Sequence, residues 1–81
     1  MPYIKQEKRA SFENGTGKME VPGDVNYILT RVCSEYLNDK GKSYQTYNDI
    51  IGALECCKLE MYRRAVAPYE DIKISTNGDV F

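Results

Sequence analysis

The chain has 81 residues, of which 42% are hydrophobic and 28% are charged, and its formal net charge at pH 7 is −1. This composition is typical of a soluble globular protein, and the near-zero charge excludes one that binds nucleic acid or anionic membranes through a global positive field. A chain of this size buries only about 60–65% of its unfolded surface, so small domains usually add disulfides, a metal ion or a partner subunit.

The cysteine pattern argues against disulfides and metal. Cys33, Cys56 and Cys57 are odd in number and two are adjacent, unlike a secreted disulfide framework. Adjacent cysteines diverge by about 100° on a helix and cannot chelate a metal together, so we expect two small buried apolar residues there. There is no N-terminal apolar run and no stretch long enough to span a membrane. We therefore expect a cytoplasmic protein with free thiols, no metal and no cofactor.

The first 20 residues read as an N-terminal arm. Asn14-Gly15 and Gly17 interrupt it, and a short helical turn over residues 6–12 is possible. Two interpretations stay open. The segment is either a flexible arm or a piece that docks through Tyr3, Ile4 and Phe12.

An amphipathic helix is predicted over residues 24–40. Asp24 is placed to cap its first N–H groups, and Gly41 is placed to end it in the left-handed region. Its apolar residues recur at helical spacing and form one stripe: Val25, Ile28, Leu29, Val32, Cys33, Tyr36 and Leu37.

A second helix is predicted over residues 43–66, starting near Ser43 or Thr46. Thr46 with Asp49 three residues later is close to a capping box, with Asp in place of Glu. The main apolar stripe is Tyr47, Ile50, Ile51, Leu54, Cys57, Met61 and Ala65.

Pro68 is expected to end or kink this helix, because proline moves the preceding residue, Ala67, away from helical backbone angles. A short helix over residues 68–76 then follows. The predicted fold is a single small all-α domain over residues 1–81. It is an antiparallel helical hairpin with a short C-terminal helical piece, completed by homo-oligomerisation.

Lys58 does not fit the helical pattern, because it falls inside the apolar arc of residues 43–66, about 40° from its centre. Glu55 lies three residues earlier and is placed to pair with it. Lys58 either extends its ammonium group to the rim or lines a polar pocket between helices. Arg64 lies at the opposite edge of the arc.

A second apolar strip runs along the other side of the helix, through Gly52, Cys56 and Leu59. On the first helix, Tyr27 likewise points away from the main stripe, near Arg31. A helix that is apolar on two sides is usually covered on two sides. The N-terminal arm or a second subunit could supply the cover, and we favour a closed homo-oligomer with Tyr27, Arg31, Cys56 and Leu59 at its interface.

The sequence favours binding over catalysis. It has no histidine, no G-x-S-x-G elbow, no Walker loop and no dinucleotide fingerprint, so an enzyme is not expected. The segment 58–69 combines cationic donors with flat aromatic faces, a combination suited to an anionic, nucleotide-like ligand. The candidate ligand-binding residues are Lys58, Tyr62, Arg63, Arg64 and Tyr69. The alternative is an ordinary charged helix end.

Three blocks of the sequence support a family resemblance: MPYIK at the start, GDVNYILTR at 23–31, and SYQTYNDIIGALECCKLEMYRRAVAPYEDIKISTNGDV at 43–80. The chain resembles a family of short proteins of bacteria and bacteriophages that has no settled activity. The resemblance implies a viral or prophage setting. By analogy, small helical proteins in that setting act against host defence, for example by sequestering nucleotide second messengers.

Two other functions stay open. One is a protein–protein interaction module that inhibits a host factor through the Tyr27/Arg31 or Cys56/Leu59 face. The other is a small DNA- or RNA-binding accessory protein, which the net charge of −1 makes a weaker hypothesis.

Overall fold

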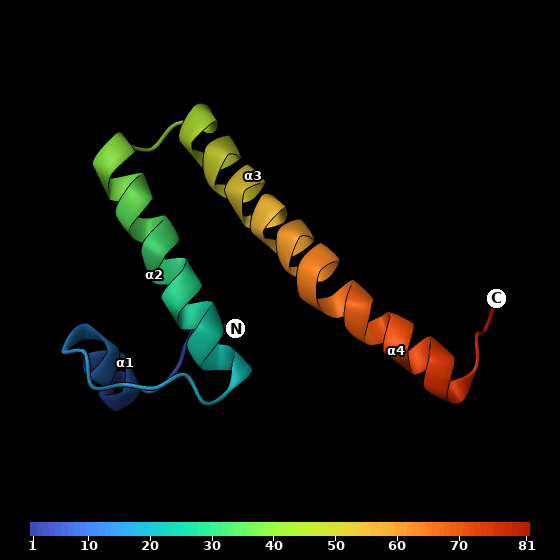
Figure 1. Cartoon of the computed structure of the whole chain (residues 1–81). Coiled ribbons are helices and arrows are strands. Elements are labelled where there is room, and N and C mark those ends of the chain that lie inside the picture. The colour runs from blue at the N-terminus through green and yellow to red at the C-terminus, as the bar shows by residue number, and fades with distance from the viewer. The chain divides into compact units, whose positions relative to one another are not determined.

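The computed structural model describes residues 1–81 and contains helices but no strands, as the sequence predicts. The elements are α1 (Gln6–Glu13), α2 (Pro22–Lys40), α3 (Tyr44–Met61), the π-helical turn η1 (Tyr62–Val66) and α4 (Ala67–Asn77) (Figure 1). The chain divides into two compact units, residues 1–46 and 47–81, where the sequence predicts one small domain. The antiparallel hairpin of the two long helices stays a prediction.

The first unit is organised by the packing of α1 on the first half of α2. The Phe12 ring lies against the Tyr27 ring with centroids 6.0 Å apart, and the Arg9 guanidinium lies 5.7 Å from the centre of the Tyr27 ring. Tyr27 is only 7% exposed and is the one large apolar side chain that is buried. Phe12 therefore docks the N-terminal segment, whereas Tyr3 stays exposed.

Helix α2 begins at Pro22, two residues before the predicted start, and Asp24 is not its N-cap. Proline suits this position because its fixed φ is already helical and its missing N–H would have no helical partner. Asp24 instead lies in the first turn and is 3% exposed. Its Oδ2 accepts hydrogen bonds from the backbone N–H of Glu20 at 2.9 Å and of Val21 at 3.3 Å. The carboxylate thus fixes the chain that enters the helix.

Lys8 connects α1 to the segment that enters α2. Its ammonium group donates to the Glu20 carboxylate and lies 3.8 Å from Asp24 Oδ2. The hydrogen bond to Glu20 raises the pKa of Lys8 above its ordinary value of 10.5. The loop between α1 and α2 requires glycine at position 17, because a Cβ there would collide with the Ser11 side chain.

The α2–α3 connection differs from its prediction in two details. Gly41 ends α2 with a positive φ, as predicted, but its ψ of 153° lies outside the left-handed helical region. Helix α3 starts at Tyr44, and the Oγ of Ser43 accepts the Thr46 N–H at 3.1 Å. Ser43 is therefore the cap, and the predicted box headed by Thr46 is wrong.

Pro68 does not interrupt the second long helix. Ala67 keeps helical angles, φ −60° and ψ −46°, and its N–H bonds to the carbonyl of Tyr62, five residues back. Proline in a regular helix collides with the carbonyl four residues earlier, and the wider π turn gives its ring room. Residues 44–77 therefore form one continuous helix, and the prediction of separate helices over 43–66 and 68–76 is wrong.

Most of the apolar stripe of the long helix is exposed. None of residues 47–81 is buried, and Ile51, Leu59, Met61 and Ile72 are more than half exposed. A helix this amphipathic depends on tertiary packing for most of its stability.

We expect Asp24→Ala to lower the free energy of unfolding by about 1–2 kcal/mol, because two part-buried N–H groups lose their acceptor. Urea unfolding followed by circular dichroism measures this loss. Asp39→Ala, an exposed carboxylate at the other end of α2, is the matched control and should change stability little. Equal losses in the two variants would contradict this role for Asp24.

Candidate anion-binding surface

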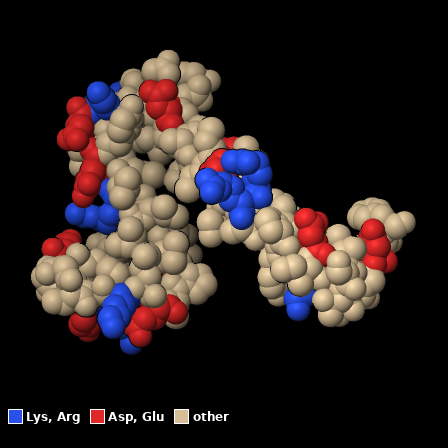
Figure 2. All heavy atoms as spheres, in the orientation of Figure 1, with Lys and Arg blue, Asp and Glu red and all other residues tan.

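The predicted ligand-binding residues lie along the end of α3, through η1 and into the first turn of α4. Figure 2 shows Lys and Arg atoms gathered over this part of the long helix, beside acidic atoms. The side chains of Lys58, Arg63 and Arg64 are 69%, 70% and 72% exposed. Tyr62 and Tyr69 are at least half exposed as well.

Each cation of this segment has a carboxylate neighbour on its own helix. Lys58 Nζ lies 3.1 Å from Glu55 Oε1, which confirms the predicted pair. Glu60 Oε1 accepts from Arg63 at 2.8 Å and lies 3.8 Å from Arg64. Exposed pairs of this kind contribute only a few tenths of a kcal/mol, so a stronger anion can compete for the donors.

Lys58 reaches solvent rather than a pocket within the chain. Its exposed ammonium group and its pair with Glu55 match the interpretation in which the side chain extends to the rim. Any pocket that uses Lys58 would have to be completed by another surface. Cys56 and Cys57 are both exposed free thiols, so the prediction that they are buried apolar residues is wrong.

The two tyrosines are held by different neighbours. The Tyr62 hydroxyl donates to Glu70 Oε1, eight residues later. That hydrogen bond raises the pKa of Tyr62 above its ordinary value of 10.0, and the negative charge of Glu70 acts in the same direction. The Lys73 ammonium group lies 5.5 Å from the centre of the Tyr69 ring. Both rings keep an exposed face that could stack on a flat ligand.

The Tyr62–Glu70 contact depends on the π turn. In a regular α-helix, residues eight apart differ by about 80° around the axis. One extra residue in the wider turn removes about 100° of this rotation, which leaves the two side chains on one face. The sequence alone predicts separate helices over residues 43–66 and 68–76, so it gives no relation between Tyr62 and Glu70.

The four predicted interface residues have different surroundings. Tyr27 is covered by α1, so the N-terminal arm fills the role that we assigned to a second subunit. Arg31 is half exposed, with Glu13 and Glu35 each 3.9 Å away. Cys56 and Leu59 are exposed and remain available for contact.

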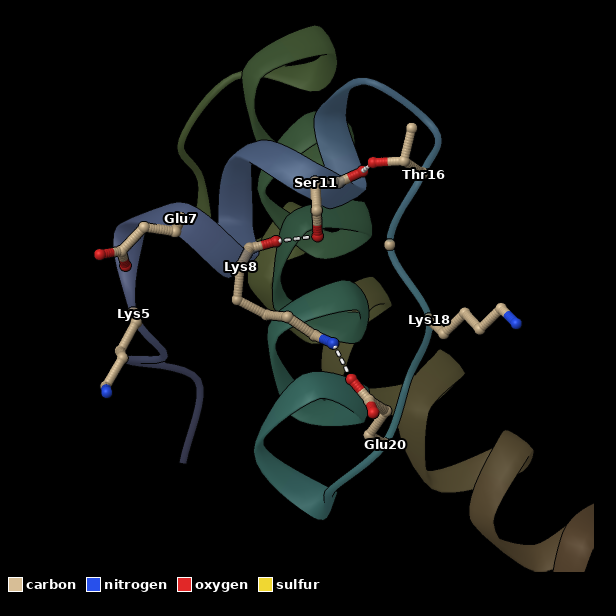
Figure 3. A pocket seen from close by; sticks show the side chains of 8 residues that line it. Lys5, Glu7, Lys8, Ser11, Thr16, Lys18 and Glu20 are labelled. Atoms are coloured by element: carbon tan, nitrogen blue, oxygen red, sulfur yellow. Dashed lines mark hydrogen bonds and ion pairs between the residues drawn. The ribbon is translucent and has the colours of Figure 1, made fainter.

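The first unit has a hollow of about 620 Å³ lined by residues of α1 and the loop that follows it. It contains Lys5, Lys8 and Lys18, but their ammonium groups do not converge (Figure 3). Lys8 points to Glu20, whereas Lys5 and Lys18 point away. Because the one inward cation is already neutralised, we do not place the anion site here.

The structure describes no metal site, since no three histidine, cysteine, aspartate or glutamate side chains lie together in a way that could hold an ion. No helix combines the length and apolar character that crossing a membrane requires.

The fold and this surface define a small all-α protein whose long helix exposes apolar side chains and a group of three cations. The chain belongs to the family described as Domain of unknown function (DUF6899), whose profile matches residues 1–80. That description assigns no activity, in agreement with the resemblance seen in the sequence. Comparison with curated proteins and with solved structures gave no match.

We expect the raised pKa of Tyr62 to depend on Glu70. The hydrogen bond contributes to stability fully below about pH 10, and this contribution is lost as the pH rises through the higher folded-state pKa. Glu70→Gln should lower the pH at which half of the Tyr62 hydroxyl is ionised. Phenolate absorbance in difference titrations against Tyr62→Phe measures this midpoint. Glu60→Gln is the control and should leave it unchanged. The same midpoint in Glu70→Gln and the unaltered chain would exclude this cause.

Proposed function

We propose that this protein is a non-catalytic binding protein that acts as a homo-oligomer and holds an anionic, nucleotide-like ligand against the segment 58–69. The observation that carries the proposal is the exposure of Lys58, Arg63 and Arg64 within seven residues of one rigid helix, next to two accessible tyrosine rings. Guanidinium groups donate in pairs to phosphates, and tyrosine rings stack on bases.

The ligand site is completed between subunits in this proposal. One helix offers a convex surface, and none of the hollows described for the first unit includes these cations. A second helix beside the first would enclose the ligand and exclude water from its phosphates. Weak pairing with Glu55 and Glu60 keeps the cations ordered and still releasable.

The biological setting is part of the same proposal. The family resemblance implies a bacteriophage or prophage setting, and the proposed site of action is the cytoplasm of a bacterial host. A stoichiometric binder of nucleotide signals would there counter a host defence by sequestering its messenger. This step is an analogy at the level of setting, since the family's description names no ligand.

A second candidate function is inhibition of a host protein through the exposed Cys56/Leu59 strip. The observation that favours it is that Leu59 is 57% exposed on a helix in which no residue after Thr46 is buried. Such a protein would bind its partner through apolar contacts and would not respond to nucleotides. A DNA- or RNA-binding accessory role is a third possibility, distinguished by a steep dependence of binding on salt.

We expect a bound nucleotide to stabilise the chain, by about 2.7 kcal/mol at a ligand concentration 100-fold above Kd. The measurement is a thermal-shift series with mononucleotides, cyclic oligonucleotides and short DNA. Lys58→Ala and Arg64→Ala should each reduce the shift, because each removes one donor to phosphate. Lys42→Ala, an exposed lysine outside the segment, is the matched control.

The possible outcomes separate the three functions. A shift with a nucleotide that survives moderate salt supports sequestration. A shift with DNA alone that disappears between 50 and about 200 mM salt supports nucleic-acid binding. No shift with any of these ligands, at concentrations up to the millimolar range, would contradict both and leave the partner-binding function.

A further inference from the structure

The later part of the long helix has an exposed apolar and charged face. Helix α2 has 19 residues, whereas α3, η1 and α4 together form a continuous helix with 18, 5 and 11 residues. At about 1.5 Å per residue, a helix as long as α2 covers little more than the first half of such a helix. Even the predicted hairpin would therefore leave the part beyond η1 exposed.

One face of this part runs through the π turn, whose extra residue removes about 100° of rotation and so aligns positions i, i+3 and i+4 with positions i+8, i+11, i+12 and i+15 beyond the turn, with i+7 inside it. It is built by Leu59, Tyr62, Arg63, Val66, Ala67, Glu70, Asp71 and Ile74, which we call the 59–74 face. The Tyr62–Glu70 hydrogen bond independently places two of its members side by side across the π turn. Val66 and Ala67, at its centre, are small and half-buried.

The 59–74 face is complementary to itself when it is reversed about the point between Val66 and Ala67. Residues at equal distances from that point form four pairs: Val66 with Ala67, Arg63 with Glu70, Tyr62 with Asp71, and Leu59 with Ile74. Three of the pairs are complementary, joining small with small, cation with anion, and apolar with apolar, whereas the Tyr62 hydroxyl already donates its one proton to Glu70. No pair sets like charges against each other.

We propose that two copies of this chain pack their 59–74 faces antiparallel about a two-fold axis at Val66 and Ala67. Antiparallel packing brings residues equally distant from the axis together, and the symmetry forms each pair twice. The small central residues let the helices approach closely, Leu59 packs on Ile74 of the partner subunit, and Arg63 pairs with Glu70 of the partner subunit. This inference deepens the homo-oligomer proposed above and rests only on that part of it.

Arg63 and Glu70 are available for this pairing. The Arg63 side chain is 70% exposed, and its bond to Glu60 at 2.8 Å uses one of five N–H donors. Glu70 accepts the Tyr62 hydroxyl through Oε1, so its second oxygen is free to accept from the partner subunit. Lys58 and Arg64 are not members of the 59–74 face, so the ligand variants above leave the interface intact.

The test is a pair of charge reversals, Arg63→Glu and Glu70→Arg. Each variant alone places like charges at both symmetric pairs. Its dimer dissociation constant should therefore be at least about tenfold higher than that of the unaltered chain. An equimolar mixture should recover the dimer, because every pair in the heterodimer again joins opposite charges. Sedimentation velocity measures the three samples, and circular dichroism checks that each variant stays helical.

Recovery on mixing cannot arise from a local effect on either helix, so it would establish the pairing. Variants that dimerise as well as the unaltered chain, or a mixture that stays monomeric, would overturn the 59–74 face while leaving an oligomer of another kind. An unaltered chain that is monomeric at high concentration would overturn both the face and the homo-oligomer. Lys42→Glu and Asp79→Arg serve as charge-matched controls outside the face.

A cross-link tests the same register without changing any charge. With Cys33, Cys56 and Cys57 replaced by serine, Ala67→Cys places one thiol from each copy next to the two-fold axis. Oxidation should give a disulfide-linked dimer in high yield. Ser75→Cys lies off the face and should cross-link far less, and equal yields would overturn the register.

Discussion

The absence of an N–H on Pro68 is the constraint on which the rest of the long helix depends. A proline ring inside a regular helix collides with the carbonyl four residues earlier. Here the helix widens into η1, Ala67 bonds five residues back to Tyr62, and the chain continues without a break to Asn77. The wider turn also changes which side chains share a face, and this change brings Tyr62 and Glu70 together.

Regular periodicity was enough to predict the all-α fold, because apolar residues at helical spacing have few other solutions. Gly41 marked the end of α2 for the same kind of local reason, since its positive φ favours glycine. The exact starts were harder. Asp24 looked like a cap, but Pro22 begins the helix earlier and turns the carboxylate toward the entering chain.

The site could be predicted only in part. The ion pairs of Lys58 with Glu55 and of Arg63 with Glu60 follow from sequence spacing alone. Burial does not follow from spacing, because it depends on what packs from elsewhere. Spacing alone leaves Tyr27 without a partner, whereas Phe12 covers it, and it predicts Cys57 to be buried, whereas the thiol is exposed. The π turn could not be predicted from a helical wheel, because the wheel assumes a rotation of about 100° at every residue.

The π turn assigns different tasks to neighbouring cations. Arg63 belongs to the 59–74 face, whereas Arg64, one residue later, does not, although both guanidinium groups lie within 3.8 Å of the same Glu60 oxygen. In an antiparallel pair, residue 64 of one copy is level with residue 69 of the other, but neither Arg64 nor Tyr69 belongs to the 59–74 face. Pairing of that face therefore does not bring Arg64 to a tyrosine ring of the partner subunit. A change at Arg64 tests ligand binding without disturbing the face.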